Sequence, residues 1–222
     1  MRPLDSLSSV GDLCPMSSIE PWDQRAARIL VRPLANSPIR PNHITALTLV
    51  MVVVAGVLFA NGNSVLVNWA AGVFVLARFL DHFDGELARL QGTGSTFGYY
   101  FDYFVGGIGY AALFIGLGVG HWQGQLGNWA LLFGGAGAAS AFISLHTNLR
   151  IDQELEIADD GDSIGYPGFA GFELEDGIYL LAPVTWLGFL MPFFAAAGIG
   201  ATIYCLWTIY SLARLRGRRR GG

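Results

Sequence analysis

Three aspartates near the middle of the chain have the side chains and spacing of a metal site. Asp81 and Asp84 are three residues apart, so a helix places both carboxylates on one face. Asp102 follows about one turn into the next apolar stretch. Three carboxylates without a histidine or cysteine ligand suit Mg²⁺ or Mn²⁺, ions that usually keep waters and bind substrate phosphates. The pattern predicts a divalent-metal and phosphate site, with buried ion pairing or ion translocation as the alternatives.

Small residues and an arginine lie beside these carboxylates in both predicted helices. Arg89 follows the first pair and offers a planar donor to phosphate, or a structural partner to one aspartate. Small residues let a ligand or a second helix approach the backbone closely. Those that share the carboxylate stripes are Gly85, Ala88, Gly98 and Gly106.

The composition places these residues in a membrane protein. The chain of 222 residues is 53% hydrophobic and 14% charged, whereas a soluble domain carries about 25% charged residues, so that class is excluded. Apolar runs of roughly 17 to 25 residues predict spanning helices. The uncharged run 177–213 is too long for one crossing, and Gly188 and Pro192 are expected to mark a turn within it. The six predicted spans are 44–60, 65–87, 97–118, 128–149, 175–189 and 192–212.

The positions of the charges orient these spans. All thirteen basic residues are arginines, and the loops 61–64, 120–127 and 188–192 carry no charged residue. Because arginine is retained on the cytoplasmic side, both termini and the carboxylate ends of the spans are predicted to be cytoplasmic. The expected fold class is an all-α integral membrane protein with six transmembrane helices, located in the cell membrane with its active site facing the cytoplasm.

An amphipathic helix is expected before the first span. Ser17 and Glu20 have capping-box spacing, and Pro21 suits the first helical turn. The arginines of this segment fall on one stripe and its apolar residues on another side, a pattern typical of a helix in the membrane interface. Packing on protein is the alternative. The basic stripe consists of Arg25, Arg28 and Arg32, and the apolar side of Ile19, Trp22, Ala26, Ile29 and Leu30.

These features divide the chain into three parts. Residues 1–40 form a cytoplasmic N-terminal segment with the interfacial helix, and residues 41–213 form the six-helix membrane domain. Residues 214–222 form a basic C-terminal tail, which is expected to anchor the last helix to anionic lipid.

The carboxylate motif resembles that of the CDP-alcohol phosphotransferases, also called CDP-alcohol phosphatidyltransferases. The family pattern is Asp-x2-Asp-Gly-x2-Ala-Arg-x8-Gly-x3-Asp-x3-Asp, and this chain matches every fixed position except the last. The segment Pro41-Asn42-His43-Ile44-Thr45 also resembles the start of the family's first span. The matching motif positions are Asp81, Asp84, Gly85, Ala88, Arg89, Gly98 and Asp102.

The resemblance implies an enzyme of phospholipid biosynthesis that acts on a CDP-activated lipid such as CDP-diacylglycerol. Asp81, Asp84 and Asp102 would hold two Mg²⁺ or Mn²⁺ ions against the diphosphate of that lipid. The hydroxyl of a small alcohol acceptor would attack the phosphorus attached to the lipid, and CMP would leave. The cytidine and phosphate pocket would be lined by Gly85, Ala88, Arg89 and Gly98.

The resemblance also implies an assembly. A homodimer surrounded by membrane lipids is expected, whereas nucleic acid is not an expected partner because the chain has no basic aromatic surface. Glycines that would permit close helix pairing are Gly134, Gly135 and Gly137.

The last motif position is Gly106, where the family has an aspartate that acts as general base and metal ligand. Glycine can do neither, and the loss of a base commonly lowers a rate by roughly 10² to 10⁴. One interpretation is that Asp176, Glu175 or Glu173, at the start of the fifth predicted span, replaces it, although acids there also simply cap a helix. A second interpretation is that the protein is a family member that binds CDP-lipid or nucleotide without turnover. A third is that Gly106 replaces a natural aspartate, because Asp and Gly codons can differ by one base.

Two residues at the cytoplasmic end of the fourth predicted span are candidates for binding the acceptor. His146 and Arg150 share a helix face, and Arg150 is the one basic residue between Arg89 and Arg214. So few basic groups favour a small acceptor without a phosphate. Arg150 could instead reach lipid headgroups, and His146 could bond between helices. A transporter is a further alternative, but it predicts acids at mid-membrane and an inverted repeat, neither of which the sequence shows.

Overall fold

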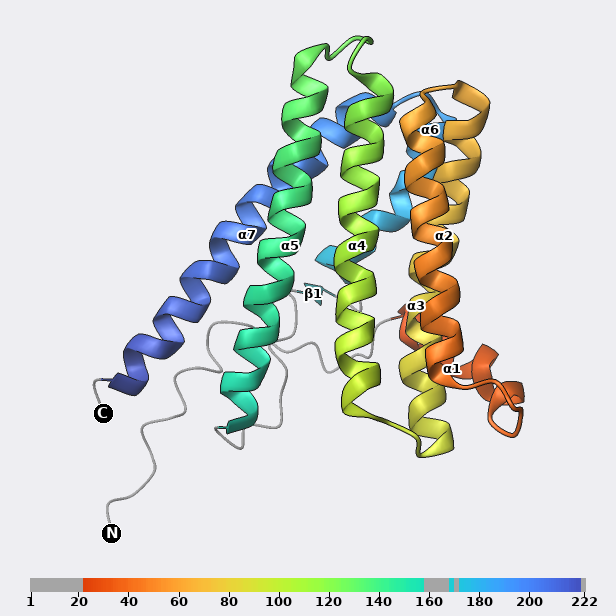
Figure 1. Ribbon diagram of the computed structural model, residues 1–222, viewed down its shortest axis with the longest axis vertical. Helices are drawn as coiled ribbons and strands as arrows, with labels where there is room; N and C mark the ends of the chain where they lie inside the picture. Colours follow the sequence, from red (N-terminus) through yellow and green to blue (C-terminus); the bar gives the residue numbers. More distant parts are fainter. Residues whose placement is uncertain (1–21, 158–167, 170–171, 221–222) are drawn as a thin grey trace.

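The chain forms an up-and-down helical bundle (Figure 1). The computed structural model describes residues 22–157, 168–169 and 172–220. Within them, five helices are long and apolar enough to cross a membrane, so the chain is an integral membrane protein. They are α2 (Pro41–Asn61), α3 (Ser64–Gln91), α4 (Thr96–His121), α5 (Asn128–Ile157) and α7 (Leu190–Arg220).

The turn between α3 and α4 brings the two halves of the carboxylate motif together. Gly92 ends α3 in the left-handed conformation, with φ of 62°, which glycine adopts at little cost. Ser95 then caps α4, its Oγ accepting a hydrogen bond of 3.0 Å from the backbone N–H of Gly98. Because this turn is short, α3 and α4 run antiparallel, and the C-terminal part of α3 lies at the same end of the bundle as the N-terminal part of α4 (Figure 1).

Glycines allow α4 to lie close to both of its neighbours. A Cβ at Gly116 would lie 2.4 Å from the carbonyl oxygen of Gly56 in α2, closer than any side chain can come. A Cβ at Gly134 of α5 would lie 2.8 Å from the carbonyl oxygen of Phe114 in α4, and Gly137 faces the Phe114 ring. The close pairing expected of Gly134 and Gly137 therefore occurs within the chain, while Gly135 has no atom within 4 Å of its Cβ position.

The segment predicted as the fifth span differs from that prediction. It forms the 3-10 helix η3 (Leu174–Leu180) followed by the short helix α6 (Leu181–Trp186). Pro183 lacks the N–H that a continuous α-helix would need and is tolerated only in the first turn of a new one, so α6 starts just before it. At rises of ~2.0 Å and ~1.5 Å per residue the two helices extend about 23 Å, less than the ~30 Å of a bilayer core. Gly188, with φ of 83°, then turns the chain into α7.

Two helices extend further than their apolar stretches. The fourth predicted span ends at residue 149, but α5 continues to Ile157, and α7 continues through the basic residues to Arg220. The tail predicted from residue 214 is therefore helical in its first part. Arg216 Nε contacts Glu154 Oε1 at 3.3 Å, which links the ends of α7 and α5.

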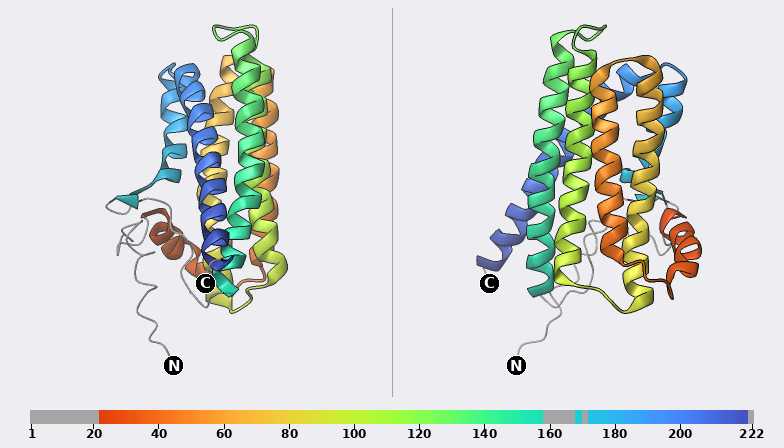
Figure 2. Two further views of the ribbon diagram at one scale, coloured as in Figure 1. Left: turned by 90° about the vertical axis from the view of Figure 1, so that its left-hand side faces the viewer. Right: turned by 45° about the vertical axis from the view of Figure 1, so that its right-hand side comes forward.

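Helix α1 (Trp22–Val31) lies beside the C-terminal part of α3 (Figure 2). It packs through Asp23, Ala27 and Val31, which are buried, and the 3-10 helix η2 (Arg32–Leu34) follows it. Ile29 and Leu30 remain 64% and 55% exposed, so the helix both packs on protein and keeps an apolar side outward. The expected cap formed by Ser17, Glu20 and Pro21, with Ile19, lies outside the described residues.

The remaining element is a small hairpin between α5 and η3. Strands β1 (Gly168–Phe169) and β2 (Phe172–Glu173) pair antiparallel, with Gly168 opposite Glu173. Figures 1 and 2 show α1, the α3–α4 turn and the C-terminal ends of α5 and α7 at one end of the bundle. This is the end that carries the motif carboxylates.

Candidate functional site

The motif carboxylates come from two helices at that end. Asp81 and Asp84 lie in the C-terminal half of α3, and Asp102 lies near the start of α4. Asp102 is close enough to Asp81 and Asp84 for their charges to interact. The fold therefore brings together the three residues that the spacing predicts as one site.

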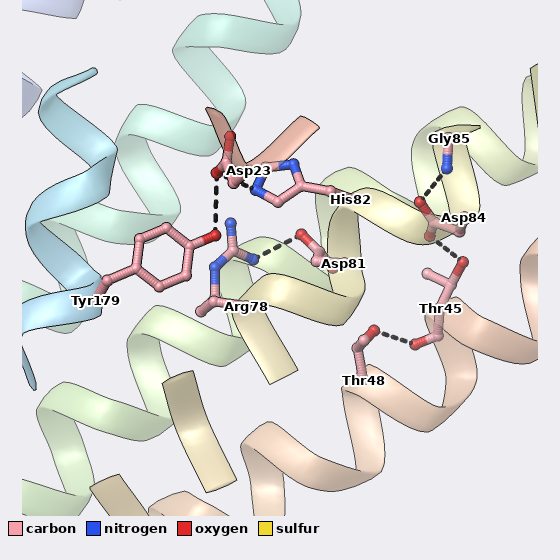
Figure 3. A network of polar contacts seen from close by, with 9 residues as sticks. All are labelled: Asp23, Thr45, Thr48, Arg78, Asp81, His82, Asp84, Gly85 and Tyr179. Atoms are coloured by element: carbon pink, nitrogen blue, oxygen red, sulfur yellow. Dashed lines mark hydrogen bonds and ion pairs between the residues drawn. The ribbon is translucent and has the colours of Figure 1, made fainter. Parts of the chain in front are cut away.

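One carboxylate oxygen of Asp81 accepts a hydrogen bond, and the other has no hydrogen-bond donor among the described residues. Arg78 Nη1 donates to Asp81 Oδ2 at 2.8 Å, one helical turn away on α3 (Figure 3). Asp81 Oδ1 is buried and has no hydrogen-bond partner among the described residues. A buried acceptor left without a donor costs about 1–3 kcal/mol, and a bound cation would remove this cost.

Asp84 is buried and is held by two donors of different helices. Thr45 Oγ1 of α2 donates to Asp84 Oδ2, and the backbone N–H of Gly85 lies 2.6 Å from Asp84 Oδ1 (Figure 3). Thr48 Oγ1 in turn donates to the carbonyl of Thr45 at 2.8 Å. Sequence reasoning assigned Thr45 no role. Its position in the family-like segment that starts at Pro41 was the available signal.

The donor set can be tested for its fit to a divalent ion. In the part of the chain that is described, no three Asp, Glu, His or Cys side chains form a group that could hold a metal as they stand. Arg78 and Thr45 each engage one oxygen that would otherwise be available. The chemical types do fit, because carboxylate oxygens are the ligands of Mg²⁺ and Mn²⁺, and the unpaired Asp81 Oδ1 is the kind of atom a ligand would satisfy.

Gly106 lies one helical turn beyond Asp102 and faces Arg78. A Cβ at position 106 would lie 3.9 Å from Arg78 Nη1, which is ordinary van der Waals contact. The Arg78 guanidinium also lies over the ring of Tyr110, 5.1 Å from its centroid. The place where the family carries its last aspartate is thus next to an arginine. Sequence reasoning assigned Arg78 no role, although its spacing of three from Asp81 was a signal.

Arg89 is held by an acid of its own helix. Its Nη2 donates to Glu86 Oε1 at 2.6 Å, and Arg28 of α1 contacts Glu86 Oε2 at 3.3 Å. The Glu86 side chain is 3% exposed and that of Arg89 64%. A Cβ at Gly85 would lie 3.8 Å from Arg89 Nη2, so these two nucleotide-binding candidates lie side by side.

The other two nucleotide-binding candidates flank the α3–α4 turn. Ala88 accepts a hydrogen bond of 3.1 Å from the N–H of Thr93 at the end of α3. A Cβ at Gly98 would lie 3.1 Å from Asn42 Oδ1 and 3.2 Å from Ser95 Oγ, which is tight. Glycine at position 98 thus allows the start of α2 to approach α4.

A second polar network joins α1, α3 and η3 beside the motif (Figure 3). His82 Nε2 and Asp23 Oδ2 are 2.9 Å apart, and Tyr179 donates to the same oxygen at 3.0 Å. Burial raises the pKa of Asp23, but the hydrogen bond and charge of His82, with the hydrogen bonds from Tyr179 and the backbone of Gln24, lower it by more, to below its usual range. No sequence signal pointed to Asp23 or Tyr179, which are 156 residues apart.

The acceptor and base candidates are not joined to this site by described contacts. His146 and Arg150 are exposed on α5, and Arg150 Nη1 donates to Gln153 Oε1 at 3.3 Å on the same helix. In the described part of the chain, neither forms a hydrogen bond or ion pair with a motif carboxylate. Glu175 and Asp176 belong to η3, but their side chains lie outside what the structure describes.

Comparisons with known proteins agree with this arrangement. The sequence model of the family described as CDP-alcohol phosphatidyltransferase matches residues 39–160. The archaetidylinositol phosphate synthase of Pyrococcus horikoshii is 24% identical over 189 residues, 82% of this chain and 96% of that protein. The phosphatidylinositol phosphate synthase of Mycobacterium tuberculosis, solved with CDP-DAG bound, has a TM-score of 0.53 and 22% identity, with 85% of this chain and 94% of that chain covered.

These comparisons establish different things. At 22% identity the solved structure shows a shared fold. The family match covers more than half of the chain and includes the carboxylate motif. The chain therefore belongs to the CDP-alcohol phosphatidyltransferase family and is a membrane transferase of phospholipid biosynthesis.

Proposed function

We propose that the protein transfers a lipid-linked phosphoryl group from a CDP-activated lipid to the hydroxyl of a small alcohol, at a site formed around Asp81, Asp84 and Asp102. A bond forms between the hydroxyl oxygen and the phosphorus next to the lipid, the bond from that phosphorus to CMP breaks, and the hydroxyl loses its proton. The observation that carries the proposal is Asp81 Oδ1, a buried carboxylate oxygen without a donor in the described structure, within a motif from two helices. CDP-DAG in the solved relative supports the donor class.

The three aspartates would hold Mg²⁺ or Mn²⁺, which would neutralise the diphosphate and stabilise the leaving phosphate. Gly85, Ala88, Arg89 and Gly98 would line the nucleotide. The Arg89 guanidinium suits a phosphate oxygen, because it is 64% exposed while Glu86 fixes one of its nitrogens.

Asp176, with Glu175 as second choice, would accept the hydroxyl proton in place of an aspartate at position 106. Both residues lie in η3, three and four positions before Tyr179. Tyr179 reaches Asp23, and Asp23 contacts His82, the neighbour of Asp81. This chain of contacts places η3 beside the motif helix and supports the assignment.

The proposed acceptor is a small alcohol. The two named relatives are an archaetidylinositol phosphate synthase and a phosphatidylinositol phosphate synthase, so a phosphorylated polyol belongs in any test. The sequence favours an acceptor without phosphate, because Arg150, with His146, is its one well-placed basic group and lies exposed.

The proposed orientation has both ends of the chain and the site at the cytoplasmic face of the cell membrane. Although η3 and α6 together are shorter than a bilayer core, they would return the chain to the other side of the membrane between α5 and α7, and this would complete six passes. The positions of α1 and the C-terminal end of α7 at one end of the bundle support an even number (Figure 1). We also propose a homodimer, as the family resemblance implies.

Release of CMP from CDP-diacylglycerol by the purified protein in detergent tests this function. The acceptor panel contains a polyol, a phosphorylated polyol and an amino alcohol, each with Mg²⁺, Mn²⁺ or a chelator. We expect release with one acceptor class, its loss with chelator and its loss in Asp81→Asn. Glu154→Gln, a change at an ion pair between α5 and α7, serves as the matched control and should retain activity.

The result that would contradict the proposal is equally specific. If the protein binds CDP-diacylglycerol but releases no CMP from it with any acceptor, the protein is a binding protein and not a transferase. Unchanged release in Asp176→Asn and Glu175→Gln would refute only the assignment of the base.

A further inference from the structure

Positions 78 and 106 belong to different helices, but the Arg78 side chain lies next to the backbone of residue 106. Arg78 extends from α3, where its Nη1 bonds Asp81 Oδ2 at 2.8 Å. The same nitrogen lies 3.9 Å from the Cβ position of residue 106 on α4. Its guanidinium is further held over Tyr110, and the side chain is 12% exposed. A carboxylate at position 106 would therefore meet a fixed positive charge.

The charges of this site balance differently from those of the family pattern. Carboxyl groups must be ionised to bind a metal, and in that state Asp81, Asp84 and Asp102 contribute three negative charges and Arg78 one positive charge, which leaves two. The family pattern has a fourth carboxylate at position 106, and four negative charges match two divalent ions. Charges removed from water need such compensation. The net charge of two in this chain matches a single divalent ion.

Two other acids beside the motif, Asp23 and Glu86, are compensated by partners of their own. Asp23 is bound by His82, by Tyr179 and by the backbone N–H of Gln24. Glu86 is bound by Arg28 and Arg89. Neither acid therefore adds to the charge that a metal ion at the motif must balance.

We propose that Arg78 takes the place of one of the two metal ions, so that the motif of this chain binds a single divalent cation. The inference rests on the metal site of the proposed function. Arg78 is then a permanent positive charge beside Asp81, with a planar set of donors that suits a phosphate oxygen. Glycine at position 106 follows from this, because a carboxylate there would pair with Arg78 and have no second ion to bind.

The number of Mn²⁺ ions bound per chain tests this inference without any substrate. The purified protein in detergent is titrated with Mn²⁺, and bound ions are counted and their electron paramagnetic resonance spectrum recorded. The wild-type chain should bind one ion with the spectrum of an isolated centre. Gly106→Asp alone should still bind one, because its new carboxylate pairs with Arg78. Gly106→Asp combined with Arg78→Met should bind two ions with an exchange-coupled spectrum.

Two matched variants control for the substitutions themselves. Gly106→Ala adds a Cβ that fits at 3.9 Å without the carboxylate, and Arg216→Met removes an exposed arginine at the end of α7. Both should bind one ion. A count of two in the wild-type chain or in Gly106→Asp alone would overturn the inference, as would a count of one in the combined variant if it is folded. The first two counts decide the question even if the combined variant does not fold.

The ion count and the test of the proposed function can give different answers. One bound ion without CMP release would support the inference and contradict the transfer reaction. CMP release by a wild-type chain that holds two coupled ions would support the reaction and overturn the inference.

Discussion

His82 of the motif helix and Asp23 of α1 are joined by a 2.9 Å contact between Nε2 and Oδ2. His82 stands between Asp81 and Asp84, so the helix that precedes the first span is attached directly to the motif. Tyr179 completes the contact from η3. Three segments far apart in the chain thus meet at one carboxylate, which is 5% exposed.

Asp23→Asn should destabilise the protein by about 1–3 kcal/mol, because a buried carboxylate that satisfies two donors is lost. The expected result is a lower melting temperature in detergent and weaker CMP release, since the His82 ring is no longer held. Glu154→Gln is the control, because an exposed ion pair contributes about 0–1 kcal/mol. Equal melting temperatures for the two variants would contradict the buried role of Asp23.

The contribution of Asp23 should depend on pH in a definite direction. Its pKa in the folded protein lies below the ordinary value of 3.8. The stability that such a carboxyl contributes is fully present above the unfolded value and is lost as the pH falls through the folded value. Because histidine itself changes charge between about pH 5 and pH 8, the comparison is confined to acidic pH, where the difference in melting temperature between wild type and Asp23→Asn should be fully present near pH 5 and shrink below pH 3.8. A difference that grows as the pH falls from about 5 to about 3 would refute this.

Glu86→Gln should weaken binding of the CDP-lipid. The carboxylate holds Arg89 beside Gly85 through a 2.6 Å contact, and a neutral amide holds a guanidinium less firmly. We expect a higher KM for CDP-diacylglycerol with a smaller change in kcat, measured by CMP release. Arg28→Gln is the matched variant, because it removes the other partner of Glu86 and leaves Arg89 in place. If both variants raise KM equally, Arg89 is not the residue that acts on the lipid.

Gly116→Ala should destabilise the bundle, because its Cβ would lie 2.4 Å from the carbonyl oxygen of Gly56 and force α2 and α4 apart. Overpacking of this kind typically costs about 1–3 kcal/mol. Gly135→Ala is the control, since nothing lies within 4 Å of its Cβ and alanine favours a helix. The melting temperature should fall in the first variant and stay equal or rise in the second. A similar fall in both would show that the contact with Gly56 does not matter.

Apolar runs predicted α2, α3 and α4 to within a few residues, because a spanning helix must satisfy its backbone inside an apolar stretch. They placed the ends of α5 and α7 too early, since helical hydrogen bonds continue among charged residues beyond the membrane. They also predicted a full helix where η3 and α6 occur. Hydropathy measures side chains, whereas Pro183 acts through its missing N–H.

The site was predictable where its residues lie close in the sequence. The spacing of Asp81 and Asp84 and the family pattern indicated the carboxylates and their helices, and the structure brings Asp102 to them. The contacts of Thr45 with Asp84 and of Tyr179 with Asp23 join residues 39 and 156 positions apart. Such contacts depend on how the helices pack, which one sequence does not specify. Arg78 was within reach of sequence reasoning, because it lies one turn from Asp81.

The hydrogen bond between Tyr179 and Asp23 also orders events during biosynthesis. The ribosome adds 156 residues after Asp23 before it reaches Tyr179, which takes roughly 8–30 s at elongation rates of about 5–20 residues per second. His82 emerges much earlier, so α1 can attach to α3 while the rest of the protein is still being translated. Tyr179 can complete the contact only after about four fifths of the chain has been made, and a nascent chain stopped before it would have Asp23 bound by His82 without the tyrosine.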